Sequence, residues 1–416
     1  MKRYFLPVLL ALALFQPGRS QAQNPGCDGS RYKDNVFTAV KKTTVQYSTA
    51  STPSGPINLE MDVYEPQGDN LSARPVVVLA HGGSFIIGNK TDLKSSCELL
   101  AKKGYVAASI QYRLYPFFVL GFPDSLDIFD QAIQAMGDMK AAVRYFRQDA
   151  ATNNQFRADA DNVFIGGYSA GAVTALHAGF LDSADAVPSF IQTIIDANGG
   201  LEGNSGSPEN HGYSSAAKAI VSMSGGIYRS SWVDAKNIPL VSIHGTADGT
   251  VPYYFGLAAD IAYLEGSGLI HPKVAAAGLL ENLHTVPGGG HSDIYEQPQF
   301  KPHLDTFWVN VTTMLEYLAC STTAAPEVEA ARENWSVYPN PATAGAFSLQ
   351  LPASVRQATV SVSDLSGRPV YRKDGVRNRE VIPVTSWPAG VYSVQIADPE
   401  DPGKRFAVQK LILTGR

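Results

Sequence analysis

Cysteine, positive charge and clustered metal-binding side chains are all scarce in this 416-residue chain. Its three cysteines, Cys27, Cys97 and Cys320, are too few and too far apart for a structural zinc site. In an oxidising compartment two of them are expected to pair, and the sequence leaves open which two. Lys and Arg do not cluster, and a formal net charge of -5 offers no basic surface to a phosphate backbone. We therefore expect no metal, no other cofactor and no nucleic-acid partner.

Long apolar runs are missing as well, apart from one at the N-terminus. The opening MKRYFLPVLLALALFQPGRSQAQ combines a cationic start with an apolar core over residues 5–15. That core is well short of the roughly 20 residues that span a bilayer. Ser20 and Ala22 have the spacing of a signal-peptide cleavage site. The pattern predicts a signal peptide over residues 1–22, export of the chain, and no membrane span in the mature protein.

The next three hundred or so residues have the alternating strand and helix pattern of an α/β protein. Apolar and polar residues first alternate in two runs separated by TPSGP, which predicts an antiparallel β-hairpin. Almost wholly apolar runs follow at PVVVLA, YVAASI, NVFIGGY, AIVSMS and PLVSIH, as expected for strands buried on both faces of a parallel sheet. Helices are predicted over residues 92–103, 126–150, 170–181, 255–266 and 303–319. The alternation predicts a doubly wound, mostly parallel sheet.

A polar stretch, STTAAPEVEAAREN, interrupts this pattern at residues 321–334 and is predicted to be a linker. Only short alternating runs follow, among them FSLQLP, ATVSVSDLSG and GVYSVQIA, separated by Gly and Pro turns. Such runs predict a small all-β sandwich over residues 335–416. The α/β domain then occupies residues 23–320.

The pentapeptide GYSAG at residues 167–171 lies directly between the apolar run NVFIG and the helical run AVTALHAGF. A serine on such a strand-to-helix turn has a strained backbone and an exposed hydroxyl, and Gly167 and Gly171 must be small to let the turn pass. A chance loop is the alternative, but the flanking strand and helix favour a nucleophile elbow at Ser169. Ser224 in SMSGG is a weaker rival because no glycine stands at the matching position before it.

A serine hydroxyl is a poor nucleophile at neutral pH, so it needs a histidine base and a carboxylate that orients the base. His291 in GGGHSD follows the last strand candidate and precedes the final helix. Asp248 follows the run PLVSI and is the only carboxylate in its turn, although Asp before Gly also forms ordinary turns. Asp293 is a weaker acid candidate because its backbone follows the loop of the histidine. Among the other histidines, His177 is expected to pack in the core and His244 to close a strand.

The run HGGSF at residues 81–85 follows the strand PVVVLA, where this architecture places an oxyanion loop. The amides of Gly83 and Ser84, with that of Ala170 after the nucleophile, are predicted to converge on one oxygen. A plain glycine turn is the alternative. His81 is expected to brace this loop by hydrogen bonding.

With these motifs in place, the stretch from about Asp28 to Ala319 resembles an α/β-hydrolase of the esterase and lipase group. It is most similar to carboxylesterase and hormone-sensitive-lipase relatives with an HGG-type oxyanion loop. Ser84 stands where those families usually have a third glycine, and GYSAG replaces their commoner GDSAG or GESAG, so subfamily and substrate stay open. The resemblance implies hydrolysis of carboxylic esters through an acyl-enzyme on Ser169.

The C-terminal region resembles the sorting domain of type IX secretion in Gram-negative bacteria. The similarity lies in VYPNP at 337, VSVSDLSGRPVY at 360, PAGVYSVQI at 388 and the final KLILTG. It implies that the secretion machinery is a partner, that the chain crosses the outer membrane, and that this domain is later removed. A carbohydrate-binding module is the alternative for this region.

The substrate is expected to be a short acyl or aryl ester, small or polymer-linked, with acetyl or feruloyl esters of polysaccharides and polyesters as candidates. Tyr112, Tyr115 and Phe117 are candidate pocket residues, with ordinary packing as the alternative. A serine peptidase of the same fold usually has a β-propeller ahead of the catalytic domain, for which the segment after Cys27 leaves no room. A catalytically silent binding module would be expected to lack part of the triad.

Overall fold

The computed structural model describes residues 26–52, 55–206, 210–321, 335–342, 345–352, 355–364, 368–398 and 409–413. These residues fall into two compact units, one within residues 1–322 and the other within residues 323–416. The predicted signal peptide over residues 1–22 lies outside the described residues, as does the predicted linker beyond Ser321.

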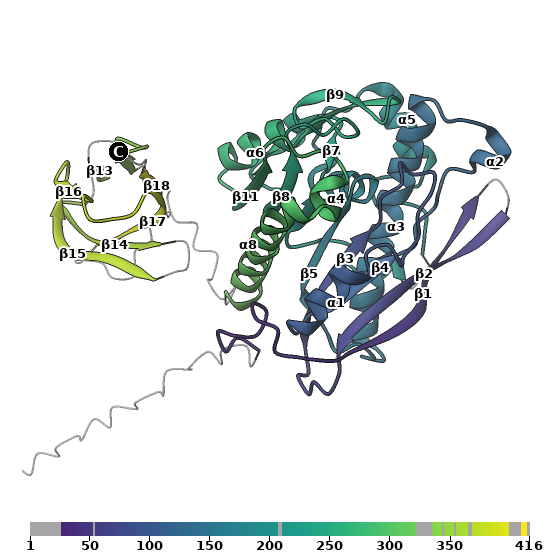
Figure 1. Ribbon diagram of the computed structural model, residues 1–416, viewed down its shortest axis with the longest axis horizontal. Coiled ribbons are helices and arrows are strands. Elements are labelled where there is room, and N and C mark those ends of the chain that lie inside the picture. Colours follow the sequence, from purple (N-terminus) through teal and green to yellow (C-terminus); the bar gives the residue numbers. More distant parts are fainter. Residues whose placement is uncertain are drawn as a thin grey trace, which may run out of the picture. The chain divides into compact units, whose positions relative to one another are not determined.

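The larger unit is built on an eight-stranded sheet with the strand order β1-β2-β4-β3-β5-β6-β8-β11 (Figure 1). The pairs β1–β2 and β2–β4 are antiparallel, and all other neighbours in this sheet are parallel. This confirms the predicted α/β class, with an initial hairpin that leads into a mostly parallel sheet. The strands are β1 (Val40–Thr52), β2 (Gly55–Pro66), β3 (Arg74–Ala80), β4 (Val106–Ile110), β5 (Ala158–Tyr168), β6 (Ile220–Met223), β8 (Leu240–Gly245) and β11 (Glu281–Val286).

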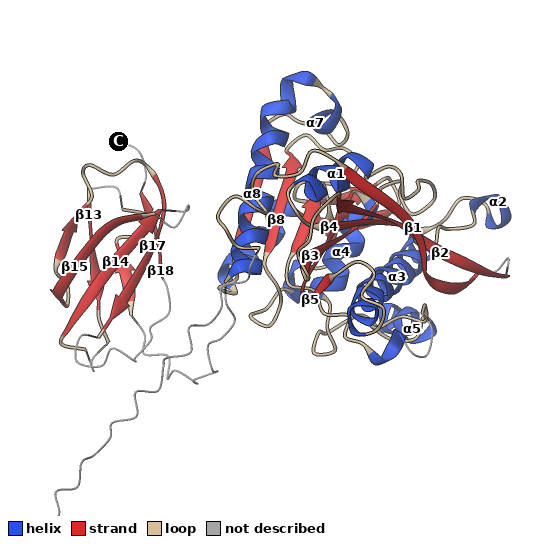
Figure 2. Cartoon of the chain, turned by 90° about the horizontal axis from the view of Figure 1, so that it is seen from below, coloured by secondary structure: helices blue, strands red, loops and turns tan. Residues whose placement is uncertain are grey.

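Helices cover both faces of this sheet (Figures 1 and 2). They are α1 (Lys94–Lys102), α2 (Phe117–Leu120), α3 (Ser125–Ala151), α4 (Ala170–Phe180), α5 (Ser189–Ala197), α6 (Ser267–Ala276), α7 (Asp293–Glu296) and α8 (Lys301–Cys320). Strand β3 shows how the two cores form, because Val76 and Val78 pack on the side of α3 and α4 whereas Val77 and Leu79 pack on the side of α1 and α8. A strand buried on both faces has no polar position, which explains its wholly apolar run.

The prediction of a helix over residues 255–266 is wrong. The segment forms two antiparallel strands, β9 (Phe255–Ala258) and β10 (Ala262–Gly266), and β10 also pairs with β7 (Gly226–Ile227). The three-residue turn 259–261 begins with Ala259 and Asp260 at φ angles of 48° and 59°, a left-handed geometry that alanine in particular rarely adopts. No Gly or Asn stands at the turn positions, where either residue would have indicated a hairpin. The Ala and Leu residues of the segment favour a helix, so the sequence predicts one.

One disulfide joins Cys27 to Cys320, with their Cα atoms 5.6 Å apart, and Cys97 is a buried free thiol. Burial raises the pKa of the Cys97 thiol far above its ordinary value, so this thiol is not a nucleophile. The bridge ties the chain ahead of β1 to the end of α8 and thereby closes the larger unit. In the part of the chain with assigned coordinates, no helix has the length and apolar character needed to cross a membrane.

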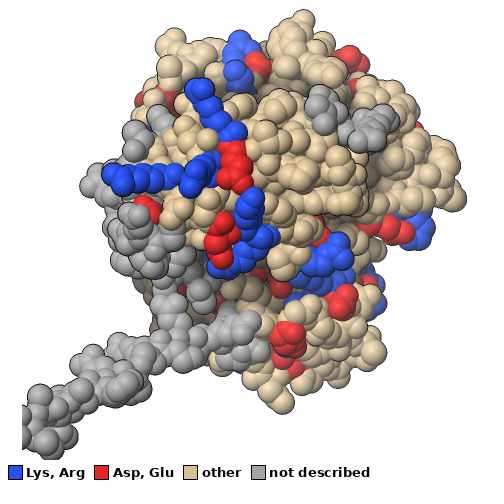
Figure 3. Space-filling view, turned by 90° about the vertical axis from the view of Figure 1, so that its left-hand side faces the viewer, with Lys and Arg blue, Asp and Glu red and all other residues tan. Residues whose placement is uncertain are grey.

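The smaller unit contains only strands and turns in its described residues, and it confirms the predicted all-β domain (Figure 2). One sheet has the order β12 (Ser336–Tyr338), β13 (Ala346–Gln350), β16 (Val381–Pro383), and the other has the order β15 (Pro369–Arg377), β14 (Gln357–Asp364), β17 (Gly390–Ala397), β18 (Gln409–Leu413). Phe347, Val360 and Val394 are among the residues of its own apolar core. Figure 3 shows acidic and basic side chains side by side on one face of the molecule. Within the smaller unit, Lys373 and Glu380 form an ion pair.

Candidate active site

Ser169 stands alone between the end of β5 and the start of α4, in the geometry of a nucleophile elbow. Its φ and ψ angles of 53° and −118° are strained for a residue with a side chain. A Cβ atom at Gly171 would overlap the carbonyl oxygen of Ala80 on β3, and one at Gly167 would meet the same oxygen. Both glycines are therefore needed to bring the turn this close to the neighbouring strand.

Three loops at the carboxyl edge of the sheet bring Ser169, a histidine and an aspartate together. The Nε2 atom of His291 lies 2.8 Å from the Oγ atom of Ser169, and its Nδ1 atom lies 2.7 Å from the Oδ2 atom of Asp248. Because a carboxylate accepts hydrogen bonds, Nδ1–H donates to Asp248 and leaves Nε2 free to accept the serine proton. The loops after β5, β8 and β11 supply the three residues.

The carboxylate of Asp248 is fully buried and accepts several hydrogen bonds. Its Oδ1 atom accepts from the backbone amides of Thr250 and Val251, each at 2.8 Å. Burial alone would raise the pKa of Asp248, but the hydrogen bonds from His244 and His291 outweigh burial and hold this pKa well below its ordinary value. Asp248 is therefore a charged acceptor throughout the neutral pH range. Sequence reasoning missed the contact with His244.

The predicted oxyanion loop passes directly beside Ser169. A Cβ atom at Gly82 would lie 3.2 Å from the Cβ atom of Ser169. Gly83, Ser84 and the next residue all have positive φ angles, and the Gly83 carbonyl accepts hydrogen bonds from the amides of residues 86 and 87. Within the described part of the chain, no group accepts a hydrogen bond from the amides of Ser84 and Ala170. Both residues line the same cavity as Ser169, so their amides are available to an oxygen bound there.

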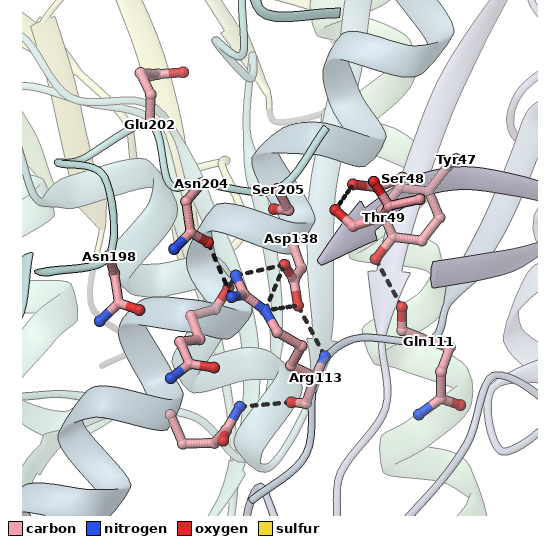
Figure 4. A network of polar contacts seen from close by, with 12 residues as sticks. Tyr47, Ser48, Thr49, Gln111, Arg113, Asp138, Asn198, Glu202, Asn204 and Ser205 are labelled. Carbon is pink, nitrogen blue, oxygen red and sulfur yellow. Dashed lines mark hydrogen bonds and ion pairs between the residues drawn. The ribbon is translucent and has the colours of Figure 1, made fainter. Parts of the chain in front are cut away.

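Tyr112, which was predicted to line a substrate pocket, braces the oxyanion loop from the core instead. Its hydroxyl donates to the His81 carbonyl at 2.8 Å, and its ring stacks on the His81 imidazole with centroids 4.3 Å apart. His81 in turn contacts the Gly82 carbonyl at 2.7 Å, in agreement with the bracing role expected for it. Next along the chain, Arg113 forms a buried salt bridge with Asp138 of α3 (Figure 4). Helix α3 thus fixes the segment that supports the loop.

A small apolar cavity of about 50 Å³ opens beside Ser169. Apart from Ser169, Ala170 and the oxyanion loop, its walls come from α3, α4 and the β9–β10 hairpin together with the loop before it. They are Ile128, Phe129, Ala132, Val173, His177, Thr250, Val251, Ala258, Ala259, Ile261, Ala262 and Leu264. His177 is buried, and burial lowers its pKa to about 4, so it adds a neutral imidazole to this wall. The cavity has room for a short aliphatic group.

Tyr115 and Phe117, the other two predicted pocket residues, line a different cavity. It measures about 410 Å³ and is walled by Ile86, Ile87, Tyr115, Pro116, Phe117, Phe118, Val119 and Phe122. Phe118 on α2 is 96% exposed at its rim. Ser84 and Phe85 line the cavity of Ser169, and the next two residues line this second one, so the two cavities flank the oxyanion loop.

The rival candidates from the sequence are engaged elsewhere. Ser224 is fully buried and its hydroxyl lies 2.8 Å from the hydroxyl of Tyr295. The carboxylate of Asp293 accepts a hydrogen bond from the amide of Gly290 at 2.7 Å. Neither side chain is hydrogen-bonded to a histidine among the described residues. In the same residues, no group of three or more His, Cys, Asp or Glu side chains is arranged to hold a metal ion.

Two family models match the chain. Residues 61–228 match BD-FAE, and residues 336–413 match the secretion system C-terminal sorting domain. The first match contains Ser169 and the oxyanion loop but ends before Asp248 and His291. Both matches confirm the predicted resemblances, to α/β-hydrolase esterases and to a sorting domain.

Curated relatives include insect esterases. Esterase P of Drosophila melanogaster is 28% identical over 142 residues, which are 33% of this chain and 25% of that protein. Esterase-5C of Drosophila miranda is 28% identical over 117 residues, which are 28% of this chain and 20% of that protein. The chain therefore spans a quarter or less of the length of these relatives.

Similar solved structures include esterase 2 of the Planctomycetes species Thermogutta terrifontis. Its propionate-bound form is 19% identical, with a TM-score of 0.48 over 67% of this chain and 95% of that chain. Its form phosphoramylated by tabun is 18% identical, with a TM-score of 0.49 over 73% of this chain and 99% of that chain.

Proposed function

We propose that this chain, which carries a BD-FAE-type α/β-hydrolase esterase domain and a secretion-system sorting domain, is an exported serine carboxylic ester hydrolase. The observation that carries the proposal is the continuous hydrogen-bonded set of Ser169, His291 and Asp248 at the mouth of an apolar cavity. Such a set supplies a nucleophile, a base and an orienting carboxylate within contact distance.

In the proposed reaction, His291 Nε2 takes the proton of Ser169 as the serine oxygen attacks the ester carbonyl carbon. The carbonyl oxygen becomes an oxyanion that the amides of Ser84 and Ala170, with that of Gly83, would stabilise. Each well-aimed donor of this kind lowers the transition-state energy by roughly 3 kcal/mol. The intermediate then collapses, the alcohol leaves with the proton from His291, and an acyl group stays on Ser169.

Water completes the cycle. His291, neutral again, removes a proton from a water molecule that attacks the acyl carbonyl. The same amides stabilise the second oxyanion. When this intermediate collapses, His291 returns the proton to Ser169 and the carboxylic acid is released. Asp248 stays ionised throughout, which the direction of its pKa shift favours, and stabilises the imidazolium that forms twice in each turnover.

The cavity beside Ser169 supports a preference for short acyl groups. Its volume of about 50 Å³ is well below the roughly 300–1,000 Å³ of pockets that hold drug-sized ligands. Its apolar walls fit a methyl or ethyl group, while an aromatic feruloyl group would need a wider opening. Acetyl esters, free or attached to a polysaccharide, are therefore the favoured substrates.

We predict that kcat/KM for p-nitrophenyl esters falls at least about tenfold from acetate to octanoate, because one misplaced methylene costs about 1–3 kcal/mol in such a pocket. The measurement is initial hydrolysis rates over a series of acyl lengths, extended to acetylated xylan, feruloyl esters and polyester film. The variant Ala132→Gly, which widens the wall on α3, should raise the relative rate on butyrate. A wild-type enzyme that prefers octanoate would contradict the assignment of this cavity to the acyl group.

The C-terminal domain, a sorting domain by its family match, implies that the protein is secreted or displayed at the cell surface. We further propose that residues 1–22 direct passage through the inner membrane and that the sorting domain is removed after outer-membrane export. A chain that ends at Thr322 should keep its esterase activity, because the larger unit has its own cores. In a host with this secretion system it should fail to reach the medium. Loss of activity would instead assign the β domain to the enzyme.

A further inference from the structure

A second histidine contacts the carboxylate of Asp248. The Nε2 atom of His244, four residues earlier at the end of β8, lies 3.2 Å from Asp248 Oδ2 and 3.0 Å from the Val251 carbonyl oxygen. Its Nδ1 atom lies 2.9 Å from the hydroxyl of Ser267, the first residue of α6. The side chains of His244 and Asp248 are both 0% exposed, so bulk water does not compete for these contacts.

The partners of His244 determine where its proton lies. Nε2 faces a carboxylate and a carbonyl, and neither can donate a hydrogen bond, so Nε2 carries a proton. In the neutral imidazole, Nδ1 is then the acceptor and the Ser267 hydroxyl donates to it. The ring is held at both nitrogen atoms, by the Asp248–Val251 turn on one side and by α6 on the other.

Four N–H groups surround the two oxygens of Asp248. Backbone amides of Thr250 and Val251 donate to Oδ1, and His291 Nδ1 donates to Oδ2 at 2.7 Å. The Nε2–H group of His244 donates to the Val251 carbonyl at 3.0 Å and lies 3.2 Å from the same Oδ2, so the carboxylate shares this proton. A carboxylate oxygen has two lone-pair directions, so each imidazole can occupy one. The amides keep the carboxylate from turning over, so Oδ2 is the oxygen that faces both imidazoles.

We propose that His244 is a positioning residue of the hydrolase, which fixes Asp248 Oδ2 for His291 and weakens the pull of the carboxylate on the His291 proton. The inference rests on the proposed function, since it requires Ser169, His291 and Asp248 to be the catalytic set. His244 itself touches no substrate, because it is buried behind Asp248.

Two substitutions distinguish the effect of the His244 hydrogen-bond donor from the effect of its side-chain packing. His244→Met keeps an apolar side chain of similar length but removes the donor, and it should lower kcat for p-nitrophenyl acetate about 10- to 100-fold with little change in KM. His244→Gln places an amide donor near the position of Nε2 and should recover most of that loss. Circular dichroism and thermal unfolding of each variant report whether the fold is retained.

The pH profile gives a readout that packing alone would not move. With less hydrogen bonding to Oδ2, the carboxylate stabilises the His291 imidazolium more strongly, so the acid limb of kcat/KM should move up by about 0.5 pH unit in His244→Met. Apart from His271 in the control variant described next, the other titratable groups around this site stay unchanged in the variants compared. They are Tyr168, Asp293, Tyr295 and Glu296 on the His291 side, and Tyr253, His271 and Glu281 on the His244 side.

His271→Met is the matched control. His271 is another buried histidine on α6, but its ring bonds to Ser242 and Glu281 at 2.9 Å and not to Asp248. Its loss should lower the unfolding temperature and leave the acid limb in place. Should His244→Met fold poorly, Ser267→Ala removes only the donor to Nδ1 and should shift kcat and the acid limb in the same direction by a smaller amount.

Equal losses in His244→Met and His244→Gln with an unmoved acid limb would overturn the proposal and leave His244 a packing role. Wild-type kcat in His244→Met would overturn it as well. These results are distinguishable from failure of the proposed function, which would appear as full esterase activity in Ser169→Ala.

Discussion

Ser169→Ala is expected to lower kcat for p-nitrophenyl acetate by about 10⁶-fold, in line with loss of the nucleophile in other serine hydrolases. Alanine retains the backbone of the elbow, and the oxyanion amides of Ser84 and Ala170 stay in place. The remaining rate should come from these amides and from binding, so KM should change little. Initial rates under saturating ester, with the enzyme concentration raised to detect the residual activity, measure this loss.

Ser224→Ala is the control for this variant. Ser224 also has a positive φ angle and lies after a strand, β6, but its hydroxyl bonds to Tyr295 rather than to a histidine. Its removal should leave kcat within a few-fold of wild type. A collapse of activity in Ser224→Ala, with activity retained in Ser169→Ala, would show that the nucleophile is Ser224 and not Ser169.

Asp248→Asn is expected to lower kcat by about 10⁴-fold. The amide would present an N–H group to His291 Nδ1, which favours the tautomer with its proton on Nε2, and that nitrogen could then no longer accept the Ser169 proton. Because two backbone amides hold the side chain by Oδ1, the fold should remain and the loss should be in kcat. Steady-state kinetics with thermal unfolding as a check on folding measure the effect.

Asp293→Asn is the natural comparison, because Asp293 lies only two residues from His291. Its carboxylate accepts from the Gly290 amide, and an asparagine oxygen can accept the same bond. The rate should stay within about tenfold of wild type. A larger loss of kcat in Asp293→Asn than in Asp248→Asn would mean that Asp293, and not Asp248, is the acid that orients His291. The comparison matters because the BD-FAE match ends at residue 228, before both of them.

Local sequence was enough to predict the elbow at Ser169 because everything that the turn needs is adjacent in the chain: a buried strand, two glycines and a helix. His291 and Asp248 could be chosen only through chain order, since their meeting depends on three strands that end at one edge of the sheet. The spacing of His244 and Asp248 in HGTAD is visible in the sequence, but a contact across a strand-end turn depends on its geometry.

The walls of the cavity were beyond sequence reasoning. They come from α3, α4 and a hairpin that is separated from α3 by more than a hundred residues. That hairpin was itself misread as a helix because its left-handed turn uses Ala259 and Asp260. The sequence predicts one substrate pocket for three aromatic residues of the segment after β4, yet the structure divides them. Tyr112 contacts the predicted oxyanion loop from inside, while Tyr115 and Phe117 line a separate cavity.

Detection of a covalent acyl-enzyme on Ser169 would test most directly whether this serine is the nucleophile. The full chain is mixed with excess p-nitrophenyl acetate, quenched with acid in the first turnovers, and analysed by peptide mass spectrometry. We expect one added acetyl group on the peptide that contains GYSAG, located at Ser169 and absent from Ser169→Ala. Rapid ester hydrolysis with no acetyl group on this peptide, or the same acetyl group in Ser169→Ala, would contradict the assignment of Ser169 as the nucleophile.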